Sequence, residues 1–156
     1  MNAADNARVC GSLQWVTGRL FELIGGWVAR VDDPADAVWL ATLSRHLGHH
    51  VAAFDDVMPD SVLLSDERAV SPADAVVEPT LAALADTADP VGTAGALVVQ
   101  LTAECGEILE NCAPHADGSL RRVVEFLMID LASVEANRLR PVAKVAETFR
   151  MVTPVV

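Results

Sequence analysis

Three histidines, His46, His49 and His50, lie within one five-residue stretch of the chain. On a helix, His46 and His50 are four residues apart and project to the same side, whereas His49 falls on another face. Imidazole nitrogens bind iron or manganese when carboxylates complete the ligand set, and they also form hydrogen bonds with acidic side chains. The pair therefore indicates either a metal site or a hydrogen-bonded pair at the edge of the core. His49 is expected at the surface.

Two acidic residues, Glu104 and Asp130, are candidates to complete a site with these histidines. Each lies about 60° from the centre of the apolar stripe on its predicted helix, as His50 does on its own, while His46 lies about 100° away. The candidates fall near the same height if the connection at residues 59–70 crosses the molecule. The sequence thus predicts one inner site of His46, His50, Glu104 and Asp130, with iron or manganese as the possible metal.

Five helices would position these residues. Apolar side chains recur at spacings of three and four, and Asp33, Ser71 and Asp89 each precede a proline at a predicted helix start. The helices are expected at residues 7–31, 34–58, 72–85, 90–112 and 119–140, and a C-terminal tail follows at 141–156. The predicted fold is all-α, a single domain over residues 1–156. It is an antiparallel four-helix bundle in which two helical hairpins are joined by a crossover containing a short extra helix.

The composition limits the partners and the location of the protein. Hydrophobic residues make up 52% of the chain and aromatic residues 4%, which suits closely packed helices. The net charge of −11 argues against binding to nucleic acid or to anionic membranes. Asp5 and Arg8 interrupt the first ten residues, so no signal peptide is expected and the cytoplasm is the predicted location.

The outer face of the first helix is a candidate protein–protein interface. Trp15, Gly18, Glu22 and Gly25 are predicted to share this face. The two glycines, seven residues apart, would let another helix approach closely, and an outward Trp is a typical anchor residue. These four residues favour a homo-oligomer, most simply a homodimer, or a complex with another protein.

Several stretches are similar to the ferritin-like superfamily, and in particular to small ferritin-like proteins of actinobacteria. They are residues 20–28 (LFELIGGWV), Asp33-Pro34, residues 44–50 (SRHLGHH), Met58-Pro59, and Asp117, Asp130 and Glu135. The resemblance implies a four-helix bundle with a di-metal centre, built from one Glu on each of two helices and a Glu-x-x-His motif on each of the other two.

The family pattern maps onto this chain only in part. By position, Glu22, His49 and either Glu104 or Glu107 are the alternative metal ligands that the resemblance implies. His46-x-x-His49 stands where the family has Glu-x-x-His, and the last helix ends its motif on Arg138. A degenerate motif of this kind predicts a bundle without a complete di-metal centre.

Three functions therefore compete. The preferred interpretation is a self-associating bundle without a cofactor, acting as a subunit or binding partner. The alternative is a non-haem iron or manganese oxidoreductase with a His/carboxylate site inside the bundle. The third is a small-ligand pocket lined by Trp39, Phe54, Met58 and Met128, with His46 or Asp130 as its polar contact.

Overall fold

The computed structural model describes residues 1–143 and 149–155 of the chain. These residues are all-helical and contain no strand, as the apolar spacing predicts. The elements are α1 (Ala3–Trp27), η1 (Val28–Arg30), α2 (Pro34–Val57), η2 (Val62–Leu64), α3 (Val77–Ala83), α4 (Pro90–Asn111) and α5 (Gly118–Ala136). Within the described ranges, no helix has the length and apolar character needed to cross a membrane.

Side-chain caps explain where the long helices begin. The Asp33 carboxylate accepts a hydrogen bond from Ala35 N at 2.8 Å, and Asp89 accepts one from Gly92 N at 3.0 Å. These bonds pair backbone N–H groups that have no acceptor within the helix. Asn2 does the same for Asp5 N at 2.9 Å, so α1 begins at Ala3, earlier than predicted.

The third and fifth helices also differ from their predicted boundaries. The third helix begins at Val77 instead of near residue 72. Asp74 accepts a hydrogen bond from Val76 N at 2.9 Å, and this local turn replaces the expected first helical turn. The fifth helix ends at Ala136, because the N–H groups of Asn137 and Arg138 bond only three residues back, to Val134 and Glu135.

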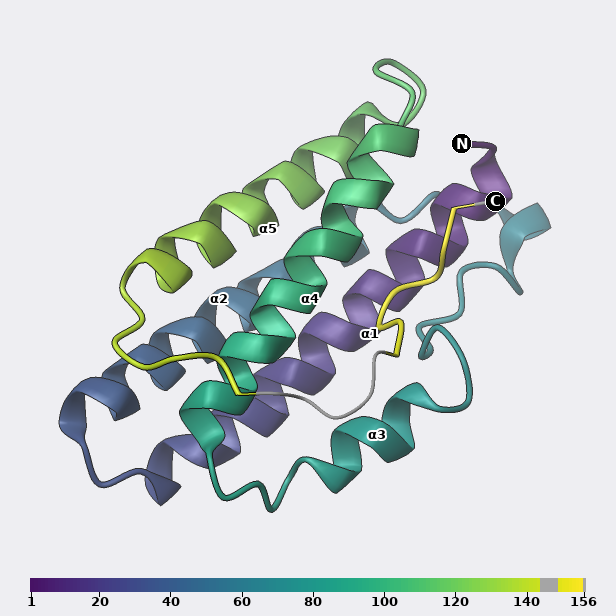
Figure 1. Cartoon of the computed structure of the whole chain (residues 1–156). Coiled ribbons are helices and arrows are strands. Elements are labelled where there is room, and N and C mark those ends of the chain that lie inside the picture. Colours follow the sequence, from purple (N-terminus) through teal and green to yellow (C-terminus); the bar gives the residue numbers. More distant parts are fainter. Residues whose placement is uncertain (144–148, 156) are drawn as a thin grey trace.

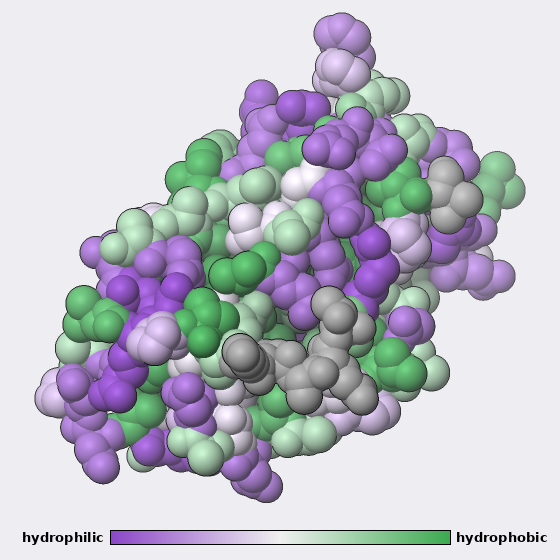
Figure 2. Space-filling model, in the orientation of Figure 1, coloured by the Kyte–Doolittle hydropathy of each residue, from purple (hydrophilic) through white to green (hydrophobic). Residues whose placement is uncertain are grey.

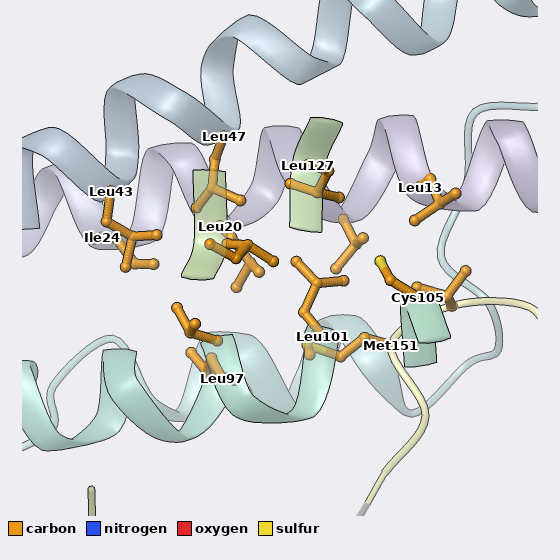
Figure 3. Close-up of a cluster of buried hydrophobic side chains, with 14 of the residues drawn as sticks. Leu13, Leu20, Ile24, Leu43, Leu47, Leu97, Leu101, Cys105, Leu127 and Met151 are labelled. Atoms are coloured by element: carbon orange, nitrogen blue, oxygen red, sulfur yellow. The ribbon is translucent and has the colours of Figure 1, made fainter. Parts of the chain in front are cut away.

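Four long helices lie alongside one another (Figure 1). Helix α1 packs against α2, α2 packs against α5, and α5 packs against α4. Their apolar faces meet in one core, and Figure 3 shows the labelled residues Leu20, Leu47, Leu97 and Leu127 at its centre. Each of these four comes from a different long helix, so the core is shared by all of them.

The connection between α2 and α4 spans the length of α1. Near the beginning of α1, the Ala69 carbonyl lies directly against Gly11. Near the end of α1, the Trp27 indole donates a hydrogen bond to the Ala85 carbonyl at 3.0 Å. Between these points α3 runs along the outside of α1 (Figure 1). The chain therefore returns to the far end of the molecule before α4 begins.

The described part of the C-terminal tail is an extended segment that packs into the body of the protein. Phe149, Met151 and Val152 are buried, and Thr153 N donates to the Ser12 hydroxyl on α1 at 3.1 Å. Figure 3 shows Met151 beside core residues of α4, and Figure 1 shows the tail between α4 and α1. The predicted tail positions 144–148 and 156 lie outside the described residues.

Candidate functional site

Two histidines of α2 meet one carboxylate of α5 where these helices pack. Asp130 Oδ2 lies 2.8 Å from His50 Nε2 and 3.2 Å from His46 Nδ1. The spacing of four residues on α2 turns both imidazoles to the same side, as predicted. The structure thus brings together three of the four residues that the sequence placed at one inner site.

The hydrogen bonds assign the protons of this cluster. A carboxylate only accepts, and a neutral imidazole has one donor nitrogen and one acceptor nitrogen. His50 Nε2 therefore donates to Asp130, which leaves His50 Nδ1 as the acceptor nitrogen of a neutral ring. His46 Nδ1 lies at ion-pair distance from the same oxygen, and a proton on this nitrogen attracts the carboxylate, so Nε2 is the acceptor nitrogen of a neutral His46 ring. His50 Nδ1 is buried and has no hydrogen-bond partner among the described residues. His46 keeps 24% of its side chain exposed, so only this imidazole is open to small molecules.

Glu104 forms hydrogen bonds with the C-terminal tail and with Gln100, and not with the histidine cluster. Its carboxylate accepts hydrogen bonds from Met151 N at 3.0 Å, from Val152 N at 2.7 Å and from the Gln100 amide at 3.0 Å. Only 5% of the residue is exposed. The buried, extended tail brings backbone N–H groups that need acceptors, and Glu104 supplies them. Glu104 therefore holds the tail in place, whereas the sequence predicted that it is a metal ligand.

Apart from the buried Glu104, the residues that the family pattern offers as ligands lie at the surface. Glu22 and His49 are exposed, and Glu107 is an exposed residue whose carboxylate pairs with Arg150 at 2.6 Å. Within residues 1–143 and 149–155, no group of three or more His, Cys, Asp or Glu side chains has the arrangement of a metal site. In the histidine cluster the nitrogens contact the Asp130 oxygen at hydrogen-bond distance, so an ion would have to displace that oxygen. The metal ligands remain a prediction.

A pocket of about 600 Å³ opens between α2 and the end of α5, and we call it the α2–α5 pocket. Its lining includes Val38, Trp39, Thr42, His46, Ser133 and Asn137. Trp39 and His46 belong to the small-ligand pocket predicted from the sequence. Phe54 does not line it, because its ring is fully buried in the core beside His50. Met58 and Met128 are likewise not part of its lining.

A second concave surface, the α1–α2 groove, runs over the outer side of the first two helices. Its lining includes Gly18, Phe21, Glu22, Gly25, Arg45 and His49, and its volume is about 740 Å³. Three of the four predicted interface residues belong to it. The fourth, Trp15, is half-buried and packs against the core.

The two glycines of the predicted interface face α2 of the same chain. A Cβ atom at Gly25 would lie 3.0 Å from the Ser44 hydroxyl, and one at Gly18 would lie 3.6 Å from a Val51 methyl group. Gly25 therefore lets α1 and α2 approach closely at Ser44, whereas a Cβ atom at Gly18 would make only an ordinary van der Waals contact. The contact within the chain explains the small size of Gly25 without a second chain, and the exposed side chains of the groove need another explanation.

The buried thiols carry no nucleophilic chemistry. Burial raises the pKa of Cys10 and of Cys105 to about 12, with a smaller contribution from the neighbouring Asp55 and Glu104 carboxylates. Both thiols are therefore protonated near neutral pH, and a protonated thiol is a poor nucleophile. They act as small apolar groups of the core.

Sequence reasoning missed a buried carboxylate at the start of α5. Asp117 accepts hydrogen bonds from the N-terminal ammonium at 3.0 Å, from the Asn6 amide at 2.9 Å and from Ala113 N at 2.8 Å. Burial by itself would raise the pKa of Asp117, but these bonds outweigh burial and lower it below its ordinary value of 3.8. In the sequence, Asp117 was part of the family resemblance, without an assigned role, and its place before a helix, after Pro114, was the other signal.

These features define an all-helical protein with a histidine–carboxylate cluster and two concave surfaces. Comparison of the chain with models of known families, with curated proteins and with solved structures found no match. The residues themselves therefore carry the functional argument.

Proposed function

We propose that this chain is a ferritin-like helical-bundle subunit that associates with a second copy of itself through the α1–α2 groove. The bundle would be an antiparallel four-helix bundle with one crossover, in which no complete di-metal centre is formed. Glu104 supports this assignment, since its carboxylate already binds backbone amides of the tail.

Contacts between helix ends support the proposed topology. The beginning of α5 meets the beginning of α1 through the bond between Asp117 and Asn6. The beginning of α2 meets the residues after α5 through the ion pair of Asp36 with Arg140 at 2.6 Å. Helix α2 thus runs opposite to both α1 and α5, and the long connection before α4 supplies the crossover.

The observation that carries the association is the mixture of side chains in the groove. Phe21 keeps 45% of its surface exposed there, and it is flanked by one acidic and one basic residue, Glu22 on α1 and Arg45 on α2. Arg45 is exposed and forms no ion pair with any described residue. A twofold axis that passes between these two residues would place each Arg45 against the partner's Glu22, because such an interface makes each contact between unlike residues twice. By contrast, the face over α4, α5 and the tail is broken into small hydrophobic and hydrophilic areas (Figure 2).

Two phenylalanine variants test this association. Phe21→Ser removes the exposed ring of the groove, and Phe126→Ser removes a ring that is 56% exposed on α5, outside the groove. We expect light scattering after size exclusion to give a dimer mass for the wild type and for Phe126→Ser, and a shift toward the monomer for Phe21→Ser. A wild type that is monomeric at high protein concentration would refute the proposal. An effect of Phe126→Ser alone would move the interface to α5.

One observation favours the alternative, a non-haem iron or manganese protein. His46 Nδ1 and His50 Nε2 are directed at one point, which the Asp130 oxygen occupies. Two imidazoles and a carboxylate are ligands that suit these metals. The test is the metal content after anaerobic incubation with ferrous iron and desalting. The alternative predicts retained iron in the wild type and in Glu107→Gln, and its loss in Asp130→Asn; wild-type protein without iron would rule this site out.

A further inference from the structure

The α2–α5 pocket has the size and the walls of a small-molecule site. Its volume of about 600 Å³ lies within the range of about 300 to 1,000 Å³ that is usual for such sites. Val38 and Leu139 line it and are both largely exposed to solvent. Trp39 forms a further wall. Its N–H is bound to the Val134 carbonyl at 2.9 Å, so Trp39 offers the pocket its apolar ring and no free donor.

Most hydrogen-bond donors around the pocket are already used by the protein. The Thr42 hydroxyl donates to the Val38 carbonyl at 2.8 Å, and the Asn137 amide donates to the Ser133 carbonyl at 2.7 Å. The groups that remain are two acceptors, His46 Nε2 and the Asn137 side-chain oxygen, together with the second amide N–H of Asn137 and the Ser133 hydroxyl, and none of these donors carries a positive charge. No Lys or Arg is among the residues that line the pocket.

Asp130 gives His46 its role in this pocket. The Asp130 oxygen lies 3.2 Å from His46 Nδ1. A proton on Nδ1 attracts this carboxylate, so in the neutral imidazole the nitrogen left for the pocket, Nε2, is an acceptor. The same carboxylate also holds His50, which packs behind His46 and is buried. An acceptor backed by a carboxylate disfavours an anionic ligand and favours one that donates a hydrogen bond.

We propose that the α2–α5 pocket binds a small molecule with an apolar body and a single hydroxyl or amino group, which donates its hydrogen bond to His46 Nε2. Carboxylates and phosphates of similar size are excluded, because they offer no donor and the pocket lining holds no cationic side chain. The lining residues of this pocket are different from those of the α1–α2 groove, and the proposal does not depend on the proposed self-association.

Three probes of equal chain length test the chemistry of the ligand. 1-Octanol, octylamine and octanoate are titrated into the full-length protein by calorimetry. We expect binding of the alcohol and the amine, and at least a tenfold weaker binding of the carboxylate. Octanoate that binds as tightly as 1-octanol would overturn the proposal, as would the absence of 1-octanol binding up to its solubility limit.

Two histidine variants on the same helix test the place of binding. His46→Phe keeps a flat ring in the wall and removes the acceptor, so the affinity for 1-octanol should fall by about tenfold, the usual effect of one hydrogen bond. His49→Phe lies three residues away in the other groove and should bind like wild type. Ser133→Leu fills the pocket and should abolish binding. Equal affinities of the two histidine variants would overturn the proposal even if Ser133→Leu fails to fold, and circular dichroism checks the fold of each.

Discussion

Glu104 and Asp130 have the same predicted role in the sequence, as ligands of one inner site, but they have different roles in the structure. Each lies about 60° from the apolar stripe of its helix. Glu104 is 5% exposed and accepts hydrogen bonds from two backbone N–H groups of the tail, whereas the side chain of Asp130 is 33% exposed and holds two imidazoles. The partner that reaches a carboxylate, and not its angle on the helix, decides between a structural and a chemical role.

Removing each carboxylate in turn tests this difference between Glu104 and Asp130. Glu104→Ala leaves buried N–H groups of Met151 and Val152 without acceptors, and we expect it to cost about 3 kcal/mol of unfolding free energy. Asp130→Ala removes the acceptor of the buried His50, but it also opens space beside His46, which solvent already reaches, so we expect about 1 kcal/mol. Denaturant unfolding followed by circular dichroism measures both.

The matched control for this pair is Glu107→Ala, on the same helix as Glu104. It removes an exposed ion pair with Arg150, so we expect less than about 0.5 kcal/mol. If Asp130→Ala proves as costly as Glu104→Ala, the histidine cluster is a structural anchor and the contrast between the two carboxylates does not hold.

A smaller effect is expected from pH, through the buried carboxylate of Asp117. The pKa of Asp117 is lowered in the folded protein from its ordinary value of 3.8. Its ionised form therefore stabilises the fold fully above that ordinary value, and this contribution is lost as the pH falls through the lower, folded-state pKa. Asp117→Asn should lower the melting temperature near neutral pH and make it less dependent on pH in the acid range. Parallel melting curves of the variant and the wild type against pH would show that another group controls acid unfolding.

The helices were predictable because they rest on local signals. Asp33-Pro34 and Asp89-Pro90 begin α2 and α4 where expected, since cap and first-turn preferences are set within a few residues. Ser71-Pro72 resembles these starts, but Asp74 closes a competing turn. The start of the third helix depends on whether Ser71 caps it or Asp74 closes a turn, and the pattern of residue types does not decide between the two.

The candidate site was predictable only where two periodic helices meet. His46 and His50 reach Asp130 because α2 and α5 present regular faces to each other. The partners of Glu104 lie in a tail without periodicity, so no helical wheel could place them. Gly18 and Gly25 do line the α1–α2 groove on the outer side of the helices, but they also face α2 of the same chain. A helical wheel of α1 alone does not show which neighbouring helix lies beside a residue at the margin of its apolar stripe.

The most direct test of the proposed subunit role is the molar mass of charge-reversal variants. Glu22→Arg and Arg45→Glu each place like charges across the twofold axis of the proposed dimer, whereas the double variant restores opposite charges. Sedimentation equilibrium should give a shift toward the monomer for each single variant and a recovered dimer for the double variant. Single variants that stay dimeric, or a double variant that stays monomeric, would contradict self-association through the α1–α2 groove.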